Sequence, residues 1–115
     1  MTEIVQEAVE SYYEYLKNLP TGCQTIADNF RENKISKALE LIIYFTEGAN
    51  WLAEISESLK NNDISVNLKT EKIHGFLKEV NHGLEIQDYI LVADMFEYEI
   101  APFFEELVLI EGQQN

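Results

Sequence analysis

The two histidines of this 115-residue chain each follow a glutamate by three positions, in Glu71-x-x-His74 and Glu79-x-x-His82. On a helix this spacing puts a carboxylate and an imidazole on one face, as in the metal sites of di-iron helical bundles. Those sites draw their motifs from different helices, whereas both motifs here fall in one segment. The second motif is also turned by about 80° around the helix axis. The four residues are therefore weak metal candidates, and we expect no bound metal.

Four acidic residues fall at the expected edges of a helical bundle: Glu40, Glu47, Asp94 and Glu97. General acid or base catalysis requires such carboxylates to lie in a cleft. Asp94 and Glu97 are three residues apart in a very apolar segment, but an acid beside a buried tyrosine hydroxyl is also a common structural pairing. The chain has no Ser-His-Asp or Cys-His catalytic set, no glycine-rich phosphate loop and no Cys-x-x-Cys pair. We therefore expect a protein that is not an enzyme and carries no cofactor.

Acidic side chains dominate the charge of the chain. Twenty-one Asp and Glu residues against eight Lys and Arg residues give a formal net charge of −13. Such a field repels phosphate backbones and anionic lipid surfaces, which excludes nucleic acid and membranes as partners. This negative charge is consistent with binding to a basic protein partner. It is equally consistent with an acidic surface that only keeps the protein soluble. Because 46% of the residues are apolar and 11% aromatic, we expect a folded single domain over residues 1–115.

Cys23 is the only cysteine, so no internal disulfide can form. It falls on the apolar stripe of the first predicted helix, where a thiol usually acts as a small buried hydrophobe. The sequence shows neither a basic and apolar leader nor a run of about 18 apolar residues. These features predict a cytoplasmic protein.

Apolar residues recur at intervals of three and four, which is the period of a helix and not of a strand. In the first segment they keep one phase across Pro20. Two unrelated helices would have no reason to share that phase, so we predict one helix from about Glu3 to Glu32, kinked at Pro20. The alternative is a true break there, which would give five helices. The stripe consists of Val5, Ala8, Tyr12, Tyr15, Leu19, Cys23, Ile26 and Phe30.

Three further helices are predicted, over about 34–60, 65–82 and 88–110. Asn33 can take the left-handed conformation that ends a helix, and Gly83 is a natural stop for the third one. Loops this short join antiparallel neighbours. The sequence thus predicts an all-α fold, an antiparallel up-down-up-down four-helix bundle.

The last predicted helix carries apolar residues on two opposite faces. One face repeats with a 4-3-4-3 spacing, which is typical of a helix packed lengthwise in a bundle. Its residues are Tyr89, Ala93, Phe96, Ile100, Phe103, Leu107 and Ile110. The opposite face, which we call the second ridge, consists of Leu91, Met95, Tyr98, Pro102 and Leu109. The first face is expected to join the core, which leaves the second ridge for another protein, a second copy, or another part of the same chain.

Tyr44, Gly48 and Trp51 follow one edge of the second predicted helix. Gly48 has no side chain and allows another backbone to approach closely. Exposed Trp and Tyr residues often dominate the energy of protein binding, although they also commonly pack on a neighbouring helix. Tyr44 and Trp51 are therefore candidates for partner binding, together with the second ridge.

Three stretches resemble small acidic helical proteins of unknown function from Gram-positive bacteria. They are Ala38–Leu41 (ALEL), Glu47–Leu52 (EGANWL) and Asp88–Pro102 (DYILVADMFEYEIAP). The resemblance implies an intracellular bacterial helical protein and brings no activity with it. In size, acidity and helicity the chain also resembles secretion and flagellar export chaperones, at the level of fold alone.

Together these features predict a non-enzymatic protein–protein interaction module, of adaptor or chaperone type. It would bind a partner helix, a basic partner or a second copy of itself. A homodimer is the economical form, because most oligomers are symmetric. The alternative, from a different class, is a helical bundle that binds a metal or a small ligand through His74 or His82 and nearby glutamates.

Overall fold

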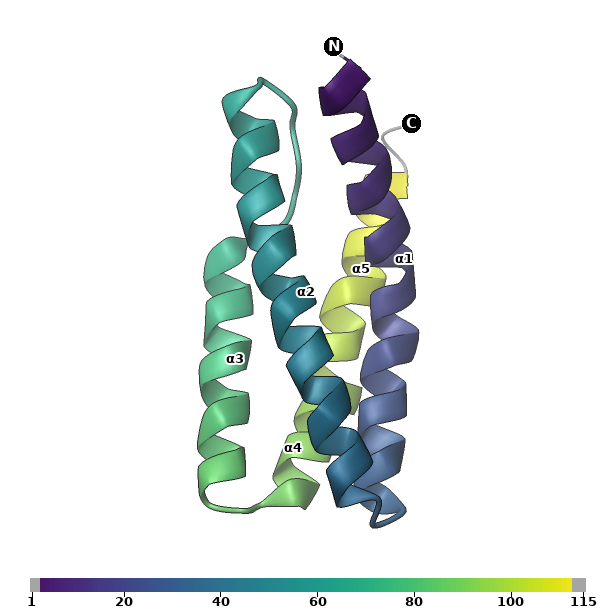
Figure 1. The fold of residues 1–115 in the computed structure, drawn as a ribbon, viewed down its shortest axis with the longest axis vertical. Helices are drawn as coiled ribbons and strands as arrows, with labels where there is room; N and C mark the ends of the chain where they lie inside the picture. The colour runs from purple at the N-terminus through teal and green to yellow at the C-terminus, as the bar shows by residue number, and fades with distance from the viewer. Residues whose placement is uncertain (1–2, 113–115) are drawn as a thin grey trace.

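The computed structural model describes residues 3–112, which form helices joined by short connections, with no β-strand in that span. Four helical rods run alternately up and down along the long axis of the molecule (Figure 1). The predicted all-α four-helix bundle is thereby confirmed. The elements are α1 (Glu3–Arg31), α2 (Ile35–Asn61), α3 (Thr70–Glu85) and a last rod made of α4 (Tyr89–Met95), the π-helix η1 (Phe96–Ile100) and α5 (Ala101–Gly112).

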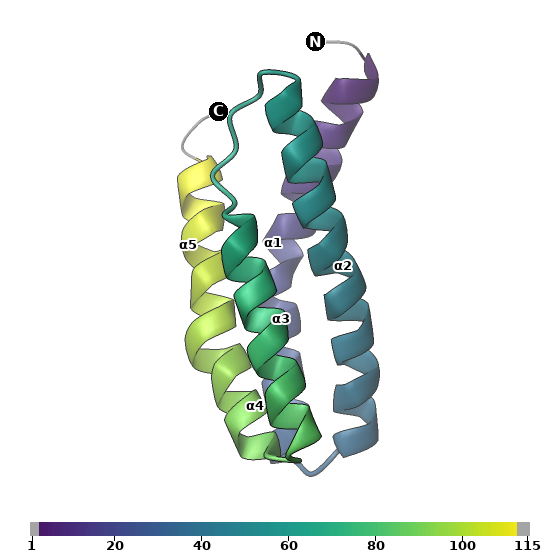
Figure 2. The same ribbon diagram turned by 90° about the vertical axis from the view of Figure 1, so that its left-hand side faces the viewer.

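Each rod packs against two neighbours, so the bundle closes around its core. α1 contacts α2 on one side and the last rod on the other, and α3 lies between α2 and α4 (Figures 1 and 2). In the core, the Phe45 ring of α2 meets the rings of Phe96 and Phe104 edge to face, with centroid distances of 5.1 and 6.3 Å. Such pairs contribute about 0.5–1.5 kcal/mol beyond burial itself. Aromatic contacts thus connect α2 to the last rod across the core.

α1 runs without interruption through Pro20, so the alternative of five helices, broken at this residue, is wrong. Proline inside a helix removes one hydrogen bond and costs about 3 kcal/mol or more. The buried side chains Leu16, Leu19 and Cys23 flank it and share the face that packs into the core. A break would turn part of this face away from the core, and the loss of that burial outweighs the missing hydrogen bond.

Three helices end in the same way, at a residue with a left-handed backbone. These residues are Asn33 (φ 63°), Asp63 (φ 61°) and Gln87 (φ 54°). After each of them, the next N–H bonds a carbonyl five residues back, as from Lys34 to Asn29 at 2.8 Å, which is the pattern of a Schellman motif. The prediction that Asn33 ends the first helix is confirmed.

The prediction that Gly83 ends the third helix is wrong, because α3 continues to Glu85 and Gln87 takes the left-handed position. Gly83 is buried within the helix and lies against α4. A Cβ atom placed on it would come within 2.7 Å of Val92 Cγ2. Glycine is thus needed here for the close approach of two helices.

Residues 64–69 form an extended strap, where a helix was predicted to begin at about Ser65. Their apolar residues, Ile64, Val66 and Leu68, alternate with polar ones, which is the period of an extended chain. Leu68 is fully buried in the core. Figure 1 shows the strap running from the top of α2 back down to the start of α3. The third helix therefore begins more than one turn later than predicted.

η1 is a π-helical turn in the middle of the last rod. The Ala101 N–H bonds the carbonyl of Phe96, five residues back, and Pro102 follows directly. In a regular α-helix the Pro102 ring would clash with the carbonyl of Tyr98. We attribute the wider turn to this clash, because π-turns are one of the ways in which a helix accommodates a disrupted hydrogen-bond ladder.

The wider turn adds one residue and shifts the buried stripe of the last rod by one position. The predicted seam continues through Phe103 and Ile110, but Phe103 is only half-buried and Ile110 is exposed. Phe104 and Glu111 take the core positions, at 0% and 1% exposure. Beyond η1 the predicted seam is right at Leu107, which is 5% exposed. It is wrong at Phe103 and Ile110, because a constant 4-3 repeat assumes an uninterrupted α-helix.

Met95 is 3% exposed, so this member of the second ridge packs against other parts of the same chain, which is one of the three possibilities left open by the sequence, and it is not available to a partner. α4 contacts both α1 and α3. Packing against two helices buries a wider part of the α4 surface than a single apolar stripe would cover. The other members of the ridge, Leu91, Tyr98, Pro102 and Leu109, are exposed. The second ridge is therefore interrupted in its middle.

Replacing Gln87 by glycine should stabilise the protein, because glycine adopts a left-handed backbone without steric cost. We expect the free energy of unfolding to rise by about 0.5–1 kcal/mol. Gln87→Val, with a β-branched side chain, should lower it. Denaturant unfolding of the three proteins measures the difference, and a Gln87→Gly protein less stable than the original would contradict this account of the turn.

Met95→Glu should cost more than about 3 kcal/mol of stability, because it buries a charge without a partner. Leu109→Glu, on the exposed side of the same rod, is the matched control and should change stability by less than about 0.5 kcal/mol. Thermal unfolding followed by circular dichroism compares the two variants. Equal melting temperatures would argue against the burial of Met95.

The Cys23 thiol should be inert in the folded protein. Its side chain is fully buried, and burial, followed by the charge of Glu105, raises its pKa to about 12. At pH 8 almost no thiolate is present and no reagent reaches the sulfur. We expect a disulfide reagent such as dithionitrobenzoate to label Cys23 only in denaturant; rapid labelling of the native protein would show that α1 opens locally.

Candidate functional site

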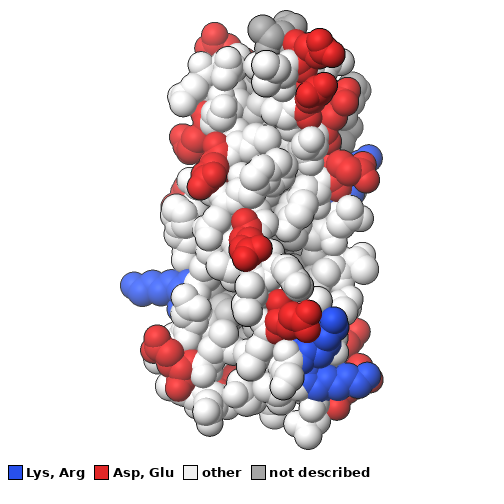
Figure 3. All heavy atoms as spheres, viewed as in Figure 1, with Lys and Arg blue, Asp and Glu red and all other residues white. Residues whose placement is uncertain are grey.

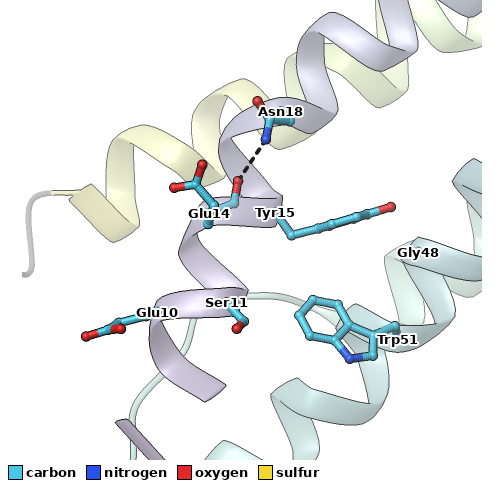
Figure 4. A pocket seen from close by; sticks show the side chains of 7 residues that line it. All are labelled: Glu10, Ser11, Glu14, Tyr15, Asn18, Gly48 and Trp51. Atoms are coloured by element: carbon cyan, nitrogen blue, oxygen red, sulfur yellow. Dashed lines mark hydrogen bonds between the residues drawn. The ribbon is translucent and has the colours of Figure 1, made fainter. Parts of the chain in front are cut away.

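A groove follows the line where α1 packs on α2. Its wider part has a volume of about 600 Å³ and is shown in Figure 4. This part is lined by Glu10, Ser11, Glu14, Tyr15, Asn18, Gly48 and Trp51. A narrower part of about 190 Å³ continues past Tyr15 and Asn18 as far as Gly22 and Tyr44. We call the two parts together the α1–α2 groove.

Tyr15 forms the floor of the groove where its two parts meet. The side chain reaches from α1 across to Gly48 on α2 (Figure 4). A Cβ atom placed on Gly48 would lie 1.5 Å from the Tyr15 hydroxyl oxygen, so only glycine leaves room for this ring. Burial, followed by the proximity of Cys23, raises the pKa of Tyr15, which therefore presents a neutral hydroxyl. Gly48 was expected to allow the close approach of another backbone. In the structure it makes room for the Tyr15 side chain instead.

Trp51 and Tyr44 both border the α1–α2 groove. The Trp51 ring packs edge to face on Tyr15, with a centroid distance of 5.5 Å, and remains partly exposed. Tyr44 is 59% exposed. Tyr44 and Trp51, the two partner-binding candidates of α2, thus both lie at the α1–α2 groove. The sequence left open whether Trp51 packs on a neighbouring helix or is available to a partner. In the structure it packs on Tyr15 of α1 and also lines the groove.

Carboxylates surround the groove. Glu10 and Glu14 are exposed on α1, and Glu47, one helical turn from both Tyr44 and Trp51, is exposed on α2. Figure 3 shows acidic side chains on both sides of an uncharged strip in the upper half of this face. An aromatic and apolar strip with acidic borders suits a ligand that is apolar on one side and basic around it.

Asp94 and Glu97, two of the candidate acids, fasten the last rod to α1. Arg31 contacts both, with Nη2 2.7 Å from Asp94 Oδ1 and Nη1 2.5 Å from Glu97 Oε1. Gln24 also donates to Glu97 Oε1, at 2.8 Å. The hydrogen bond from Gln24, with the Arg31 charge in addition, holds the pKa of Glu97 below its usual range. A lowered pKa suits a structural ion pair and not a general acid working near neutral pH.

The remaining acids and the histidine motifs lie on the surface. Glu40 is exposed, with Oε2 3.9 Å from Lys37 Nζ. All four members of the two Glu-x-x-His motifs, Glu71, His74, Glu79 and His82, are exposed on α3. Within residues 3–112, no group of three or more His, Cys, Asp or Glu side chains is arranged to hold a metal ion.

A buried polar cluster that the sequence pattern missed lies between α1, the strap and α5. Glu111 Oε1 accepts a hydrogen bond from the Tyr12 hydroxyl at 3.1 Å and one from the backbone N–H of Asn67 at 2.8 Å. Glu111 Oε2 is also buried but has no hydrogen-bond partner among the described residues. The signal in the sequence was Tyr12 itself, a core-facing phenol that requires a polar partner. The one-residue shift after η1 supplies that partner.

The comparisons with known proteins identify a family and no activity. Every helix in the described part of the chain is too short or too polar to cross a lipid bilayer. No curated protein and no solved structure matches the sequence. A family model described as a domain of unknown function, DUF8042, matches residues 7–109 and so extends from the first turns of α1 into α5. The chain therefore belongs to the DUF8042 family.

Proposed function

We propose that this protein is a non-enzymatic binding module, active in the bacterial cytoplasm, whose α1–α2 groove receives a basic amphipathic helix of a partner protein. The observation that carries the proposal is the aromatic floor of Tyr15 and Trp51, which remains partly open to solvent between two acidic borders. An amphipathic helix binds such a groove with its apolar side inward. Its basic side chains then lie beside the acidic borders.

The α1–α2 groove supports this role better than the second ridge does. Binding energy concentrates in Trp and Tyr residues at concave, well-packed positions. The groove offers Tyr15 and Trp51 in its wider part, and Tyr15 and Tyr44 in its narrower part. The second ridge loses Met95 to the core, and its Tyr98 ring already lies under the Arg31 guanidinium, 5.9 Å from the ring centroid. We therefore assign partner binding to the groove in place of the last rod.

The charge favours a basic partner over a second copy of the chain. Each copy carries a formal net charge of −13, and two copies meeting at acidic borders would repel one another. A basic partner is attracted over a distance of about one Debye length, which raises its association rate. Binding should accordingly weaken as salt increases. The alternative of a metal-binding bundle receives no support from His74 and His82, which are exposed on α3.

Trp51 is the only tryptophan and reports directly on the groove. The probe is a designed amphipathic peptide of about 14 Leu and Lys residues, roughly four turns of helix. Titration should change the emission of Trp51, whereas a Leu and Glu peptide of the same pattern should leave it unchanged. Tyr44→Ala should weaken binding by about tenfold or more, as expected for an interface tyrosine. Gly48→Ala, which displaces the Tyr15 ring from its place, should alter binding as well.

Tyr98→Ala is the matched control, since it removes another largely exposed tyrosine, this one from the second ridge. The proposal requires peptide affinity to fall in Tyr44→Ala and to stay within about twofold in Tyr98→Ala. The reverse order would assign binding to the last rod. Sedimentation of the protein alone covers the remaining case, because a stable dimer that excludes the peptide would make self-association the function of the groove.

A further inference from the structure

The two parts of the α1–α2 groove differ in charge. Glu10 and Glu14 line the wider part. Glu47 lies on α2 between Trp51 of the wider part and Tyr44 of the narrower part. Among the described residues that line the narrower part, none is charged. A ligand that spans both parts is therefore attracted by charge mainly at one end.

Polar groups close to the narrower part are largely paired within the chain. The side-chain amide of Asn18, which lines both parts, donates to the Glu14 carbonyl at 3.2 Å (Figure 4). Lys37 and Glu40 of α2, one helical turn before residues that line the narrower part, form an ion pair with each other, with 3.9 Å between Nζ and Oε2. The narrower part therefore offers a ligand mainly apolar contact.

The narrower part is an apolar pocket with a buried floor. Leu19 and Ile26 of α1 and Phe45 of α2 line it and are nearly fully buried, so they form its inner surface. Leu41 and Tyr44 line it nearer the outside. Its volume of about 190 Å³ is below the roughly 300–1,000 Å³ of small-molecule sites, whereas a cavity of about 150 Å³ can hold a benzene molecule. The pocket thus has room for one large side chain.

Gly22 leaves this pocket open on the α1 side. It follows Tyr15 and Asn18 at helical spacing and so shares their face of α1. A Cβ atom placed on Gly22 would meet no atom within 4 Å, unlike those placed on Gly48 and Gly83. Gly22 is exposed and helical, and glycine is less favourable than alanine at such a position. Neither the packing nor the backbone of the chain requires glycine here, but it gives a partner helix closer access to the pocket.

We propose that the narrower part of the groove is a specificity pocket for one large aliphatic side chain, such as leucine, of the basic partner helix. This inference rests on the function proposed above and adds the chemistry of the partner. Basic residues lie on the stretch of the partner that crosses the wider part, and the stretch over the narrower part is uncharged. An ammonium group held over the apolar floor would lose hydration without gaining a carboxylate.

The length of the groove sets the spacing within the partner. Gly22 follows Glu14 by eight residues, which is about 12 Å along α1. A partner helix that lies along the groove covers the same distance in about eight residues. Its basic residues and its aliphatic anchor are therefore about two turns apart, and a helix of about four turns spans both parts.

Designed peptides of about 14 residues, with leucine on the inner face, test this division. In the divided peptide, lysine occupies the outer positions of one half and glutamine those of the other half. It is made in both directions, because a helix can lie along the groove either way. In the mixed peptide, the same lysines and glutamines alternate. Trp51 emission should show that one divided peptide binds at least about fivefold more tightly than the mixed peptide.

Gly22→Leu places a side chain at the opening of the pocket. It should weaken binding of the preferred divided peptide by about tenfold, the effect of excluding one leucine from an apolar site, and should remove the preference over the mixed peptide. Gly75→Leu is the matched control, because Gly75 is likewise exposed in a helix with open space around it but lies on α3. It should change affinity by less than about twofold. Both variants should melt at or above the temperature of the original protein, since leucine favours a helix more than glycine does.

A double-mutant cycle identifies the anchor of the peptide. Each inner leucine in the uncharged half of the divided peptide is replaced by alanine in turn. One of these changes should weaken binding to the original protein by about tenfold. The same change should weaken binding to the Gly22→Leu protein by less than about twofold, because the side chain at position 22 already excludes the anchor.

Three results would overturn this inference: equal affinities of the Gly22→Leu and Gly75→Leu proteins, fully additive losses in the cycle, or equal binding of the mixed and divided peptides. If they accompany binding of the Leu and Lys peptide, the groove keeps its proposed function and only the specificity pocket is rejected. If instead no peptide changes the emission of Trp51, the proposed function is rejected as well.

Discussion

Pro102 constrains the last rod, and much of the upper half of the bundle depends on how the helix accommodates it. A proline at this position cannot donate to the carbonyl four residues back, and its ring crowds that carbonyl. The rod accommodates the proline through the π-turn η1, in which the Ala101 N–H donates to the carbonyl oxygen of Phe96. The helix remains continuous but gains one residue. Each side chain after the turn therefore lies about 100° behind the angular position that a regular α-helix would give it.

The shift decides which residues meet in the core. It brings Phe104 into contact with Phe45, and it turns Glu111 inward to Tyr12. Glu111 in turn holds the strap through the backbone of Asn67. A single carboxylate thus joins three segments that are far apart in the sequence. The second oxygen of this carboxylate is buried and has no hydrogen-bond partner among the described residues.

The first half of α1 carries the candidate binding site on its side toward α2. There Tyr15 of α1 and Trp51 of α2 form an aromatic floor. The acidic charge of the chain favours a basic ligand at this place. In the lower half of the bundle, Arg31 forms ion pairs with Asp94 and Glu97 and so connects the last rod to α1.

Periodicity in the sequence was sufficient to predict the helical class, the four rods, their antiparallel order and the turn at Asn33. Each of these follows from local rules, namely the spacing of apolar residues and the conformations open to a short turn. The apolar residues of the first segment keep their 3-4 spacing across Pro20. This also predicted a single first helix, since one continuous face of it has to pack against the core. The strap at residues 64–69 could have been recognised from the alternation of Ile64, Val66 and Leu68.

Only the tertiary structure decided the rest. Gly83 looked like a helix stop, and its real constraint is the Val92 side chain of another helix. Met95 was assigned to a second ridge with several possible neighbours, and two helices of the same chain bury it. The burial of Glu111 was not predicted, because a count of residues assumes a regular helix and η1 breaks that count. The sequence by itself determined which faces were apolar and acidic; which side chains face each other depended on how far one helix is turned against the next, and that is set by packing between residues distant in the chain.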